Sequence, residues 1–365
     1  MLVNAKKLKQ VLDAACEVAD RGDRPIVSYL LLSADDDGIL TISATNYSVD
    51  LSAWVEAEGP ALRCMVNALA IKRVVALAPD DGSVFLSATA NGLEISYDGS
   101  EFVLPVTDPE SFPERLPDAS DVMFPASPEL IYAIANAVQF AGKDSSRPGI
   151  CGVWIDGSVV FATDGHRLAC TEVEISGGKL GEIMIQTDAA TAIVANARRF
   201  GVNGAKIGLF RGYDSFRCSF CVGPVTITSR SSEYGMVNWR RVIGEGWQKP
   251  NVELEIAPFV DRIRRALAIS ATEKVDSMRL DVSGGQVDIT TKTIVTPAKS
   301  RAAVQGLDFG FAGKVTLNPQ YLLHALQLVG DGKVSMCIDG EMSPMALQFS
   351  EQPKFRVVLM PMCEQ

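Results

Sequence analysis

The stretch LVNAKKLKQVLDAA, residues 2–15, indicates how the whole chain is built. A short apolar run leads to Asn4, and apolar residues then follow at Leu8, Val11, Leu12 and Ala15. This i, i+3, i+4, i+7 spacing is typical of a helix that buries one face. We therefore expect a strand that leads into an amphipathic helix starting near Asn4.

The same pattern occurs twice more, as FPASPELIYAIANAV (124–138) and LEIAPFVDRIRRALA (254–268), with matched start positions at Ser127 and Ala257. A second helical pattern follows each copy: VNALAIKRVVALA (66–78), QTDAATAIVANARRF (186–200) and LNPQYLLHALQLV (317–329). The copies lie about 120 to 130 residues apart, which indicates an internal repeat. Helix signals agree with it, because N-cap residues and first-turn prolines recur at Asn67, Asp188 and Asn318 and at Pro128, Pro258 and Pro319.

A third marker is a glycine followed by a β-like run: DGILTISATN (37–46), GSVVFATDG (157–165) and GQVDITTKT (285–293). In these runs Thr45, Thr163 and Thr291 fall in register. Alternating apolar runs, typical of strands, also follow each helix. The sequence therefore predicts an α+β protein of three similar domains, each with two helices and antiparallel strands, over residues 1–121, 122–248 and 249–365.

Composition narrows the class of protein. The 365 residues are 47% apolar, which excludes a disordered chain. Neither an apolar run of about 18 to 20 residues nor the apolar core of a signal peptide is visible, so we expect a cytoplasmic protein. The net charge of −10 argues against nucleic acid as a partner, although an average can hide a segregated basic surface.

Cysteines do not indicate a metal or redox centre. The eight are scattered, and the single Cys-x-x-Cys, CSFC at 218–221, lies in alternating sequence where positions i and i+3 point to opposite faces of a strand. We expect reduced, mostly buried thiols, no metal and no cofactor.

The polar stretch FATDGHRLAC (161–170) holds Asp164, His166 and Arg167 between apolar flanks. As an enzyme site it would need a nucleophile, a metal or an oxyanion device, and no such motif accompanies it; His324 stands alone in a helical stripe. A second interpretation is a glycine-containing turn that closes a hairpin, with His166 satisfied by its neighbours. The third, a binding surface, depends on the wider pattern.

Over its whole length the chain resembles the bacterial replicative sliding clamp, the β subunit of DNA polymerase III. The resemblance rests on the threefold repeat and on ATDGHRLA (162–169), WRRV (239–242), ATEKVDSMRL (271–280), the FP of 112–113 and VVLMPM (357–362). It implies a head-to-tail homodimer whose six domains form a ring around duplex DNA, without catalytic activity. The implied partners are double-stranded DNA, DNA polymerases and a clamp loader. An alternative is a scaffold of clamp ancestry that binds peptides but is not loaded on DNA.

The resemblance also implies a pocket that accepts short motifs of polymerases and of the loader. Its residues would be Ile150, Thr163, Gly165, His166, Arg167, Leu168, Arg241, Val242, Val275, Asn318, Tyr321, Pro344, Val358, Met360, Pro361 and Met362. Three departures from the family pattern shift the expected peptide preference: Val237, Val275 and the terminal CEQ.

Two further sets of residues follow from the resemblance. The DNA-facing set is Arg24, Arg73, Lys143, Arg198, Arg199, Arg262 and Arg265. The joint between subunits would contain Phe102 and Ile269 with Asp98 or Glu101 facing Lys299 or Arg301. In the family the charges of the two edges have the opposite signs, so a double reversal here would preserve complementarity within a homodimer.

Overall fold

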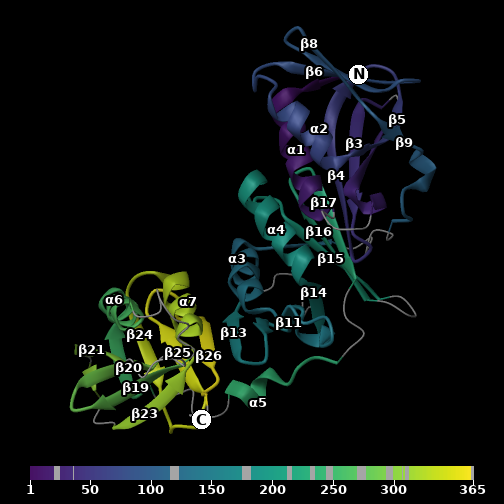
Figure 1. The fold of residues 1–365 in the computed structure, drawn as a ribbon. Helices are drawn as coiled ribbons and strands as arrows, with labels where there is room; N and C mark the ends of the chain where they lie inside the picture. Colours follow the sequence, from purple (N-terminus) through teal and green to yellow (C-terminus); the bar gives the residue numbers. More distant parts are fainter. Residues whose placement is uncertain are drawn as a thin grey trace. The chain divides into compact units, whose positions relative to one another are not determined.

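The computed structural model describes residues 1–19, 25–35, 37–115, 123–174, 182–211, 216–230, 235–243, 250–268, 277–292, 299–305, 307–308 and 312–362 (Figure 1). Packing divides the chain into two compact units. Unit 1 comprises residues 1–135, 152–157 and 174–235, and unit 2 comprises residues 136–151, 158–173 and 236–365. Both expected domain boundaries, near 121 and 248, lie outside the described residues, so the division into three domains stays a prediction.

The repeat is present in the order of the elements, because strand, helix and three strands occur twice in each copy. The first copy runs β1 (Leu2–Asn4), α1 (Ala5–Val18), β2 (Tyr29–Ala34), β3 (Ile39–Thr45), β4 (Val49–Glu58), β5 (Leu62–Asn67), α2 (Ala68–Ala76), β6 (Ser83–Thr89), β7 (Gly92–Tyr97), β8 (Ser100–Leu104). The second runs β10 (Met123–Pro125), α3 (Pro128–Ala137), β11 (Gly152–Asp156), β12 (Val159–Thr163), β13 (Arg167–Glu172), β14 (Ile183–Gln186), α4 (Thr187–Phe200), β15 (Lys206–Arg211), β16 (Phe216–Val222), β17 (Val225–Arg230).

The third copy follows the same order. It runs β18 (Val252–Glu255), α6 (Ile256–Ala266), β19 (Ser277–Ser283), β20 (Gln286–Lys292), β21 (Lys299–Gln305), β23 (Gly313–Leu317), α7 (Pro319–Val329), β24 (Lys333–Cys337), β25 (Met345–Phe349), β26 (Phe355–Leu359). Short additions are β9 (Val106–Thr107), α5 (Trp239–Ile243), β22 (Leu307–Asp308) and the 3-10 helices η1 (Pro25–Ser28), η2 (Pro109–Ser111), η3 (Val138–Phe140) and η4 (Pro148–Ile150). The α+β class and the antiparallel pairing are as the sequence predicts.

Unit 1 is organised around one antiparallel sheet whose main path is β10-β15-β16-β17-β4-β1-β6-β7-β8. Helix α1 packs on β3 and β4 and also contacts α2 and α4. The burial of β4 alternates along its second half, as expected for a strand with one face on helices. At the α1–α4 contact, Arg199 donates to Glu17 (2.5 Å) and to the Asn196 Oδ1 (2.8 Å). Strands β10 and β15–β17 of the second copy thus share one sheet with strands of the first copy, and α4 packs beside α1.

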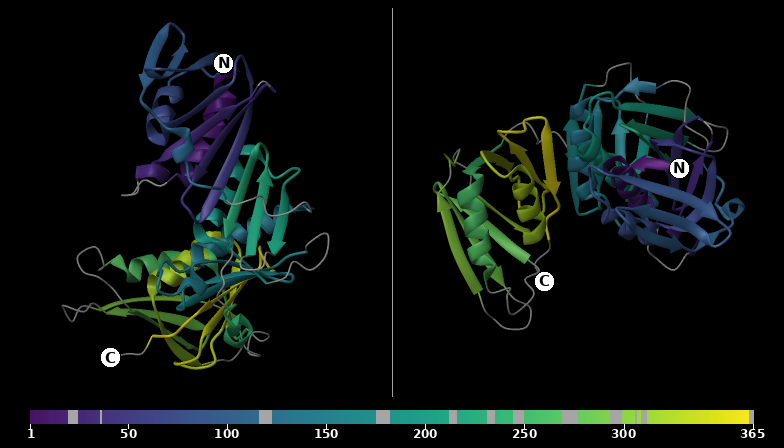
Figure 2. Two further views of the ribbon diagram at one scale, coloured as in Figure 1. Left: turned by 90° about the vertical axis from the view of Figure 1, so that its right-hand side faces the viewer. Right: turned by 90° about the horizontal axis from the view of Figure 1, so that it is seen from above.

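Unit 2 contains the antiparallel run β12-β13-β26-β25-β24-β18-β22 and the sheet β21-β20-β19-β23. Helices α6 and α7 lie side by side (Figures 1 and 2). The pairing of β13 with β26 places Arg167 opposite Leu359 and Leu168 opposite Val358. This register brings the FATDGHRLAC stretch next to the C-terminal segment.

Four of the six helix starts expected from the sequence are present at the expected residues: Asn4, Asn67, Ser127 and Asn318. Asn4, Asn67 and Asn318 cap α1, α2 and α7, each accepting a hydrogen bond from a backbone N–H of the first turn. Asp188 is not an N-cap as predicted: α4 begins at Thr187, and Asp188 lies in its first turn. There its carboxylate still complements the helix dipole, which explains why the residue type suits the position.

Ser127 likewise caps α3 at the expected position, and only the start of α6 differs slightly from expectation. Ser127 Oγ accepts from the Leu130 N–H (3.2 Å) at the start of α3. Helix α6 begins at Ile256, one residue before the expected Ala257. Terminal turns fray, so a one-residue difference carries no structural meaning.

The three in-register threonines are buried at the ends of matching strands: Thr45 in β3, Thr163 in β12 and Thr291 in β20. The thiols of Cys64, Cys170 and Cys218 are buried as predicted, and burial raises the pKa of the Cys218 thiol to about 12. Among the described residues there is no helix long and apolar enough to cross a membrane.

Candidate binding site

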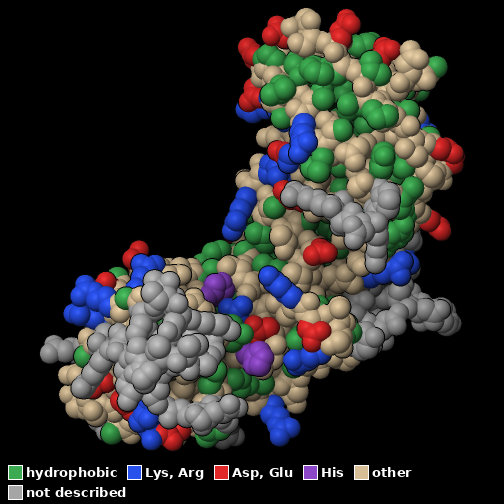
Figure 3. All heavy atoms as spheres, in the orientation of Figure 1, with side chains coloured by type: hydrophobic (Ala, Val, Ile, Leu, Met, Phe, Trp, Pro, Cys, Tyr) green, Lys and Arg blue, Asp and Glu red, His purple; other side chains and the backbone are tan. Residues whose placement is uncertain are grey.

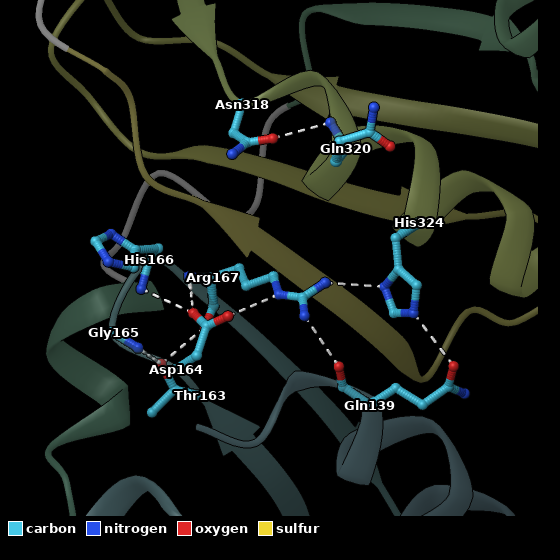
Figure 4. A network of polar contacts seen from close by, with 9 residues as sticks. All are labelled: Gln139, Thr163, Asp164, Gly165, His166, Arg167, Asn318, Gln320 and His324. Atoms are coloured by element: carbon cyan, nitrogen blue, oxygen red, sulfur yellow. Dashed lines mark hydrogen bonds and ion pairs between the residues drawn. The ribbon is translucent and has the colours of Figure 1, made fainter. Parts of the chain in front are cut away.

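The turn between β12 and β13 is held by the two residues that open it. Thr163 Oγ1 accepts from the Gly165 N–H (3.0 Å) and donates to the Arg167 carbonyl (2.7 Å). Asp164 Oδ1 accepts from the backbone N–H groups of His166 (2.9 Å) and Arg167 (3.0 Å). Such side-chain to backbone bonds stabilise tight turns. The hairpin interpretation of this stretch is therefore correct for its backbone (Figure 4).

The same turn occurs in the first copy of the repeat. Thr45 Oγ1 accepts from the Tyr47 N–H, and Asn46 Oδ1 accepts from the N–H groups of Ser48 and Val49. The third turn residue is left-handed in both copies, at φ +72° for Tyr47 and +89° for Gly165. Asparagine thus holds the first turn by the same bonds that Asp164 makes, so the carboxylate charge is not needed for the backbone.

The negative charge of Asp164 instead forms an ion pair with Arg167. Asp164 Oδ2 accepts from the Arg167 Nε (2.9 Å), and both side chains are largely buried, with 17% and 15% of their surfaces exposed. The Arg167 guanidinium also lies between the rings of Phe140 and Tyr321, 4.9 and 4.7 Å from their centroids. Cation–π contacts strengthen when the cation is desolvated. Arg167 is consequently fixed on both faces and at one edge.

Its other edge contacts η3 and α7. One terminal nitrogen donates to the Gln139 carbonyl (3.1 Å) and the other contacts His324 Nδ1 at 3.0 Å. His324 Nε2 lies 3.2 Å from Gln139 Oε1. Burial and the neighbouring Arg167 charge both lower the pKa of His324 below its ordinary value. Figure 4 shows how these groups converge on the guanidinium.

The C-terminal segment and the start of α7 complete this surface. The Met360 N–H donates to the His166 carbonyl (2.9 Å), and the Met362 N–H donates to the Thr316 carbonyl (2.8 Å), two residues before Asn318. The His166 ring lies 6.4 Å from that of Tyr321. Residues expected to form one site from three distant stretches are therefore brought together here, in unit 2. Both histidines of the chain reach the surface on the face drawn in Figure 3, with basic side chains near them.

The expected pocket residues differ in accessibility. Ile150, Thr163, Leu168 and Val358 are buried and support the surface from below. The exposed members are Gly165, His166, Arg241 and Pro344, and the partly exposed members are Arg167, Val242, Asn318, Tyr321, Met360, Pro361 and Met362. Val275 lies outside the described residues. The short helix α5, which carries Arg241 and Val242, is anchored to β12 by Trp239, whose ring lies 5.5 Å from that of Phe161.

The described members of the expected DNA-facing set lie on helices or next to them. Arg73 is exposed on α2, Arg198 on α4, and Arg262 and Arg265 on α6, while Lys143 follows η3. Two of the set are engaged within the chain: Arg199 with Glu17, and Arg265 with Asp261 (2.8 Å). Arg24 lies outside the described residues. Of the set, Arg199 is the least suited to contact DNA, because its charge is paired and its side chain is only 20% exposed.

The residues expected at a joint between subunits lie on two outermost strands. Glu101 and Phe102 are on β8, the last strand of its sheet path, and Asp98 is in the turn that precedes it. Phe102 stacks on Tyr97 with ring centroids 5.6 Å apart. Lys299 and Arg301 are on β21, the outermost strand of its sheet, though their side chains lie outside the described part of the structure. Ile269 lies outside it altogether.

Sequence reasoning missed His324, Gln139, Phe140 and Arg147. The spacing of Tyr321 and His324 by three residues places both on one face of α7, which is the available signal for His324. Phe140 and Gln139 carry no such signal. Arg147 reaches over the turn, since a Cβ built on Gly165 would lie 3.0 Å from its guanidinium nitrogens.

The bonding of Asp164 argues against a role for this residue as a catalytic base. Both oxygens of Asp164 are used, one by the turn and the other by Arg167. A general base must reach a substrate proton, and the Asp164 side chain, only 17% exposed, is already bound to the turn and to Arg167. The geometry instead holds cationic and aromatic groups at a surface, as a binding site requires.

Comparison with known proteins gives one consistent result. Residues 240–363 match the family described as DNA polymerase III beta subunit, C-terminal domain. Proteins named beta sliding clamp from Rickettsia bellii and Caulobacter vibrioides are 24% and 25% identical to this chain, covering 99% and 98% of it and 98% of each relative. The sliding clamp of Bartonella birtlesii bound to griselimycin superposes with a TM-score of 0.90 at 19% identity, over 100% of this chain and 99% of that one. The β subunit of Thermotoga maritima gives 0.88 at 20% identity, with the same coverage.

The repeated turn provides a matched test of the two roles of Asp164. Asp164→Asn keeps the acceptor that Asn46 provides in the first copy, but it replaces the carboxylate oxygen facing the Arg167 Nε–H with an amide NH2, so we expect a loss of unfolding free energy of about 1–3 kcal/mol. Asp164→Ala also leaves backbone N–H groups without their acceptor, and the expected loss is larger by about 1–2 kcal/mol. Urea denaturation measures both variants, with Asn46→Ala as the control for the turn alone. Equal losses for the two Asp164 variants would contradict the assignment.

Proposed function

We propose that this chain, which belongs to the family of bacterial sliding clamps, the β subunit of DNA polymerase III, encircles duplex DNA and tethers DNA polymerases to it. The observation that carries the proposal is the convergence of the 163–168 turn, the start of α7 and the 358–362 segment on one surface, in a chain that has the clamp fold along its whole length. The function requires no chemistry of its own, so we propose that the protein is not an enzyme. Its expected place is the cytoplasm, where bacterial DNA and polymerases are.

The convergent surface suits peptide motifs of several partners. Met360 and Met362 are half-exposed beside the turn, and methionine side chains adapt to differently shaped apolar groups. Tyr321 and Arg167 present an aromatic face and a fixed cation next to them. A peptide can therefore bury aliphatic or aromatic anchors against the methionines while its carbonyls or acidic flanks contact the arginine.

Ring closure would use the two outermost strands. An outermost strand presents unpaired backbone N–H and C=O groups, which pair readily with a second such strand. Strand β8 of one subunit and β21 of the next would extend one sheet into the other, with acidic residues on the first strand and basic residues on the second. A ring of this kind holds DNA by enclosing it, so a net charge of −10 is compatible with a DNA-bound function.

The experiment that tests the function is loading onto nicked circular DNA. With a clamp loader and ATP, we expect the protein to remain on the circle through gel filtration and to leave when the DNA is cut to a linear form. A chain that binds clamp-binding peptides yet is never retained on circular DNA would support the alternative, a peptide-binding scaffold. Retention that survives linearisation would argue for ordinary DNA binding.

The peptide surface is tested by truncating Met362. A peptide of the pattern Gln-x-aliphatic-x-Phe is expected to bind with a Kd of about 1 μM, and Met362→Ala to weaken it by about 1 kcal/mol, or roughly fivefold, through lost apolar contact. The matched control is Met123→Ala, which truncates a half-buried methionine of unit 1. Leu168 is also expected to matter, but it is only 1% exposed, so its truncation lowers folding stability as well. Calorimetric titration that gives equal affinities for both methionine variants would place the site elsewhere.

The proposed contact between β8 and β21 of neighbouring subunits is tested by reversing the charge on β8 and then the two charges on β21. Glu101→Lys is expected to weaken the dimer, because a third cation would face Lys299 and Arg301. Adding Lys299→Glu and Arg301→Glu is expected to restore it. A charge pair at the edge of an interface contributes only about 0 to 1 kcal/mol. Such a small change shifts the concentration at which the dimer dissociates, so we would measure it by sedimentation over a dilution series. Glu58→Lys, an exposed reversal on β4, is the control; if it weakens the dimer as much as Glu101→Lys, the assignment of β8 to the joint is wrong.

A further inference from the structure

His324 occupies a position in which only its neutral form fits. An arginine side chain donates hydrogen bonds and cannot accept them, so the 3.0 Å contact with Arg167 requires a lone pair on His324 Nδ1. The proton of the neutral ring is then on Nε2, which donates to Gln139 Oε1 at 3.2 Å. Both ring nitrogens are thus used, and the geometry selects one tautomer.

Among the residues that the structure describes, no carboxylate is bonded to His324. From β13 it faces the Arg167 guanidinium, and from η3 it faces the Gln139 amide and the Phe140 ring, whose centroid is 5.2 Å away. The aromatic group of its own helix on that side is Tyr321, which stacks on the guanidinium. The nearest carboxylate in the network, Asp164, is bonded to the far side of Arg167. A proton on Nδ1 would place two cations in contact and remove the acceptor.

We propose that neutral His324 is the positioning residue that holds Arg167 in the peptide-binding surface, and that protonation of His324 releases the guanidinium and weakens peptide binding. This inference rests on the proposed function, because it assigns pH regulation to the same surface. Arg167 is a permanent cation, so His324 is the member of the pair that changes charge. The released arginine leaves the gap between Phe140 and Tyr321, and the ring of Tyr321 loses the contact that orients it toward the peptide.

The direction of the pH dependence follows from the linkage of proton binding to structure. His324 titrates below its ordinary value of 6.5, because burial and Arg167 disfavour the charged ring. The unfolded chain therefore binds a proton at this position more readily than the folded chain does. The contribution of the network to stability is present above pH 6.5 and is lost as the pH falls below that value. Peptide binding is expected to lose affinity over the same acidic range.

The experiment measures peptide affinity against pH with a probe that does not titrate. The full-length protein is titrated with acetyl-Gln-Ala-Leu-Ala-Phe-amide between about pH 8 and about pH 5, a range in which histidine is the side chain that ordinarily changes charge. The key variant is His324→Asn, whose amide oxygen can accept from Arg167 where Nδ1 does but cannot become cationic. The matched control is His166→Gln, which removes the other histidine of the surface. Thermal unfolding at about pH 8 checks that both variants are folded.

We expect the wild-type affinity to fall at least about fivefold toward pH 5, that of His166→Gln to fall equally, and that of His324→Asn to stay within about twofold. The proposal is overturned if the peptide affinity of His324→Asn still falls toward pH 5, or if that of His166→Gln no longer does. Tight peptide binding by the wild type whose affinity does not change toward pH 5 also overturns the proposal, but it leaves the proposed function intact. No binding at pH 8 would remove the proposed function itself.

A second measurement does not depend on the peptide. The chain has two histidines, so ¹⁵N-histidine labelling gives two sets of ring signals, and the His166→Gln variant identifies those of His324. We expect an unprotonated Nδ1 and a protonated Nε2 near neutral pH, with a titration midpoint below 6.5. A protonated Nδ1 in the neutral ring, or a midpoint above 6.5, would overturn the assignment of His324 as the acceptor.

Discussion

A permanent charge held largely out of water is the constraint on which the candidate site depends. The Arg167 guanidinium cannot lose its proton, so every direction in which it loses water must supply an acceptor or an aromatic face. Asp164, the Gln139 carbonyl, His324, Phe140 and Tyr321 supply them. These partners come from a turn, a 3-10 helix and α7, so the requirements of one side chain tie three elements together. The outer side of this arrangement is the surface that we propose for peptide binding.

The internal repeat separates what the turn needs from what the site needs. Thr45 and Asn46 hold the first turn by the same hydrogen bonds that Thr163 and Asp164 make in the second. The first turn nevertheless has Val49 where the second has Arg167, and it has no ion pair there. One scaffold has thus been kept for its backbone geometry, while the side chains at its end have diverged. In the third copy the threonine remains buried, but Thr291 bonds to the Ala266 carbonyl instead.

Sheet pairing between copies of the repeat is the second structural requirement. Strand β17 pairs with β4 within unit 1, and β13 pairs with β26 within unit 2. Each pairing joins stretches that are far apart in the chain. The β13–β26 register fixes which residues of the turn face the C-terminal segment, because a shift by one residue would point Leu168 and Val358 to the opposite face. The position of Met360 beside His166 follows from that register.

The sequence by itself determined the repeat, the α+β class and most helix starts, because these depend on local signals: the apolar spacing after Asn4, the caps Asn67 and Asn318, and the β-runs ending at the buried threonines. The sequence-based prediction was wrong at Asp188, because aspartate is favoured both as an N-cap and in the first turn of a helix. Through the family resemblance the sequence also named stretches that lie together at the candidate site. Only the tertiary structure decided that His324 belongs to that site, since its partner Gln139 is 185 residues away in the chain. A contact at that separation exists only once β13 has paired with β26 and α7 has packed beside them, and no local pattern encodes such a contact.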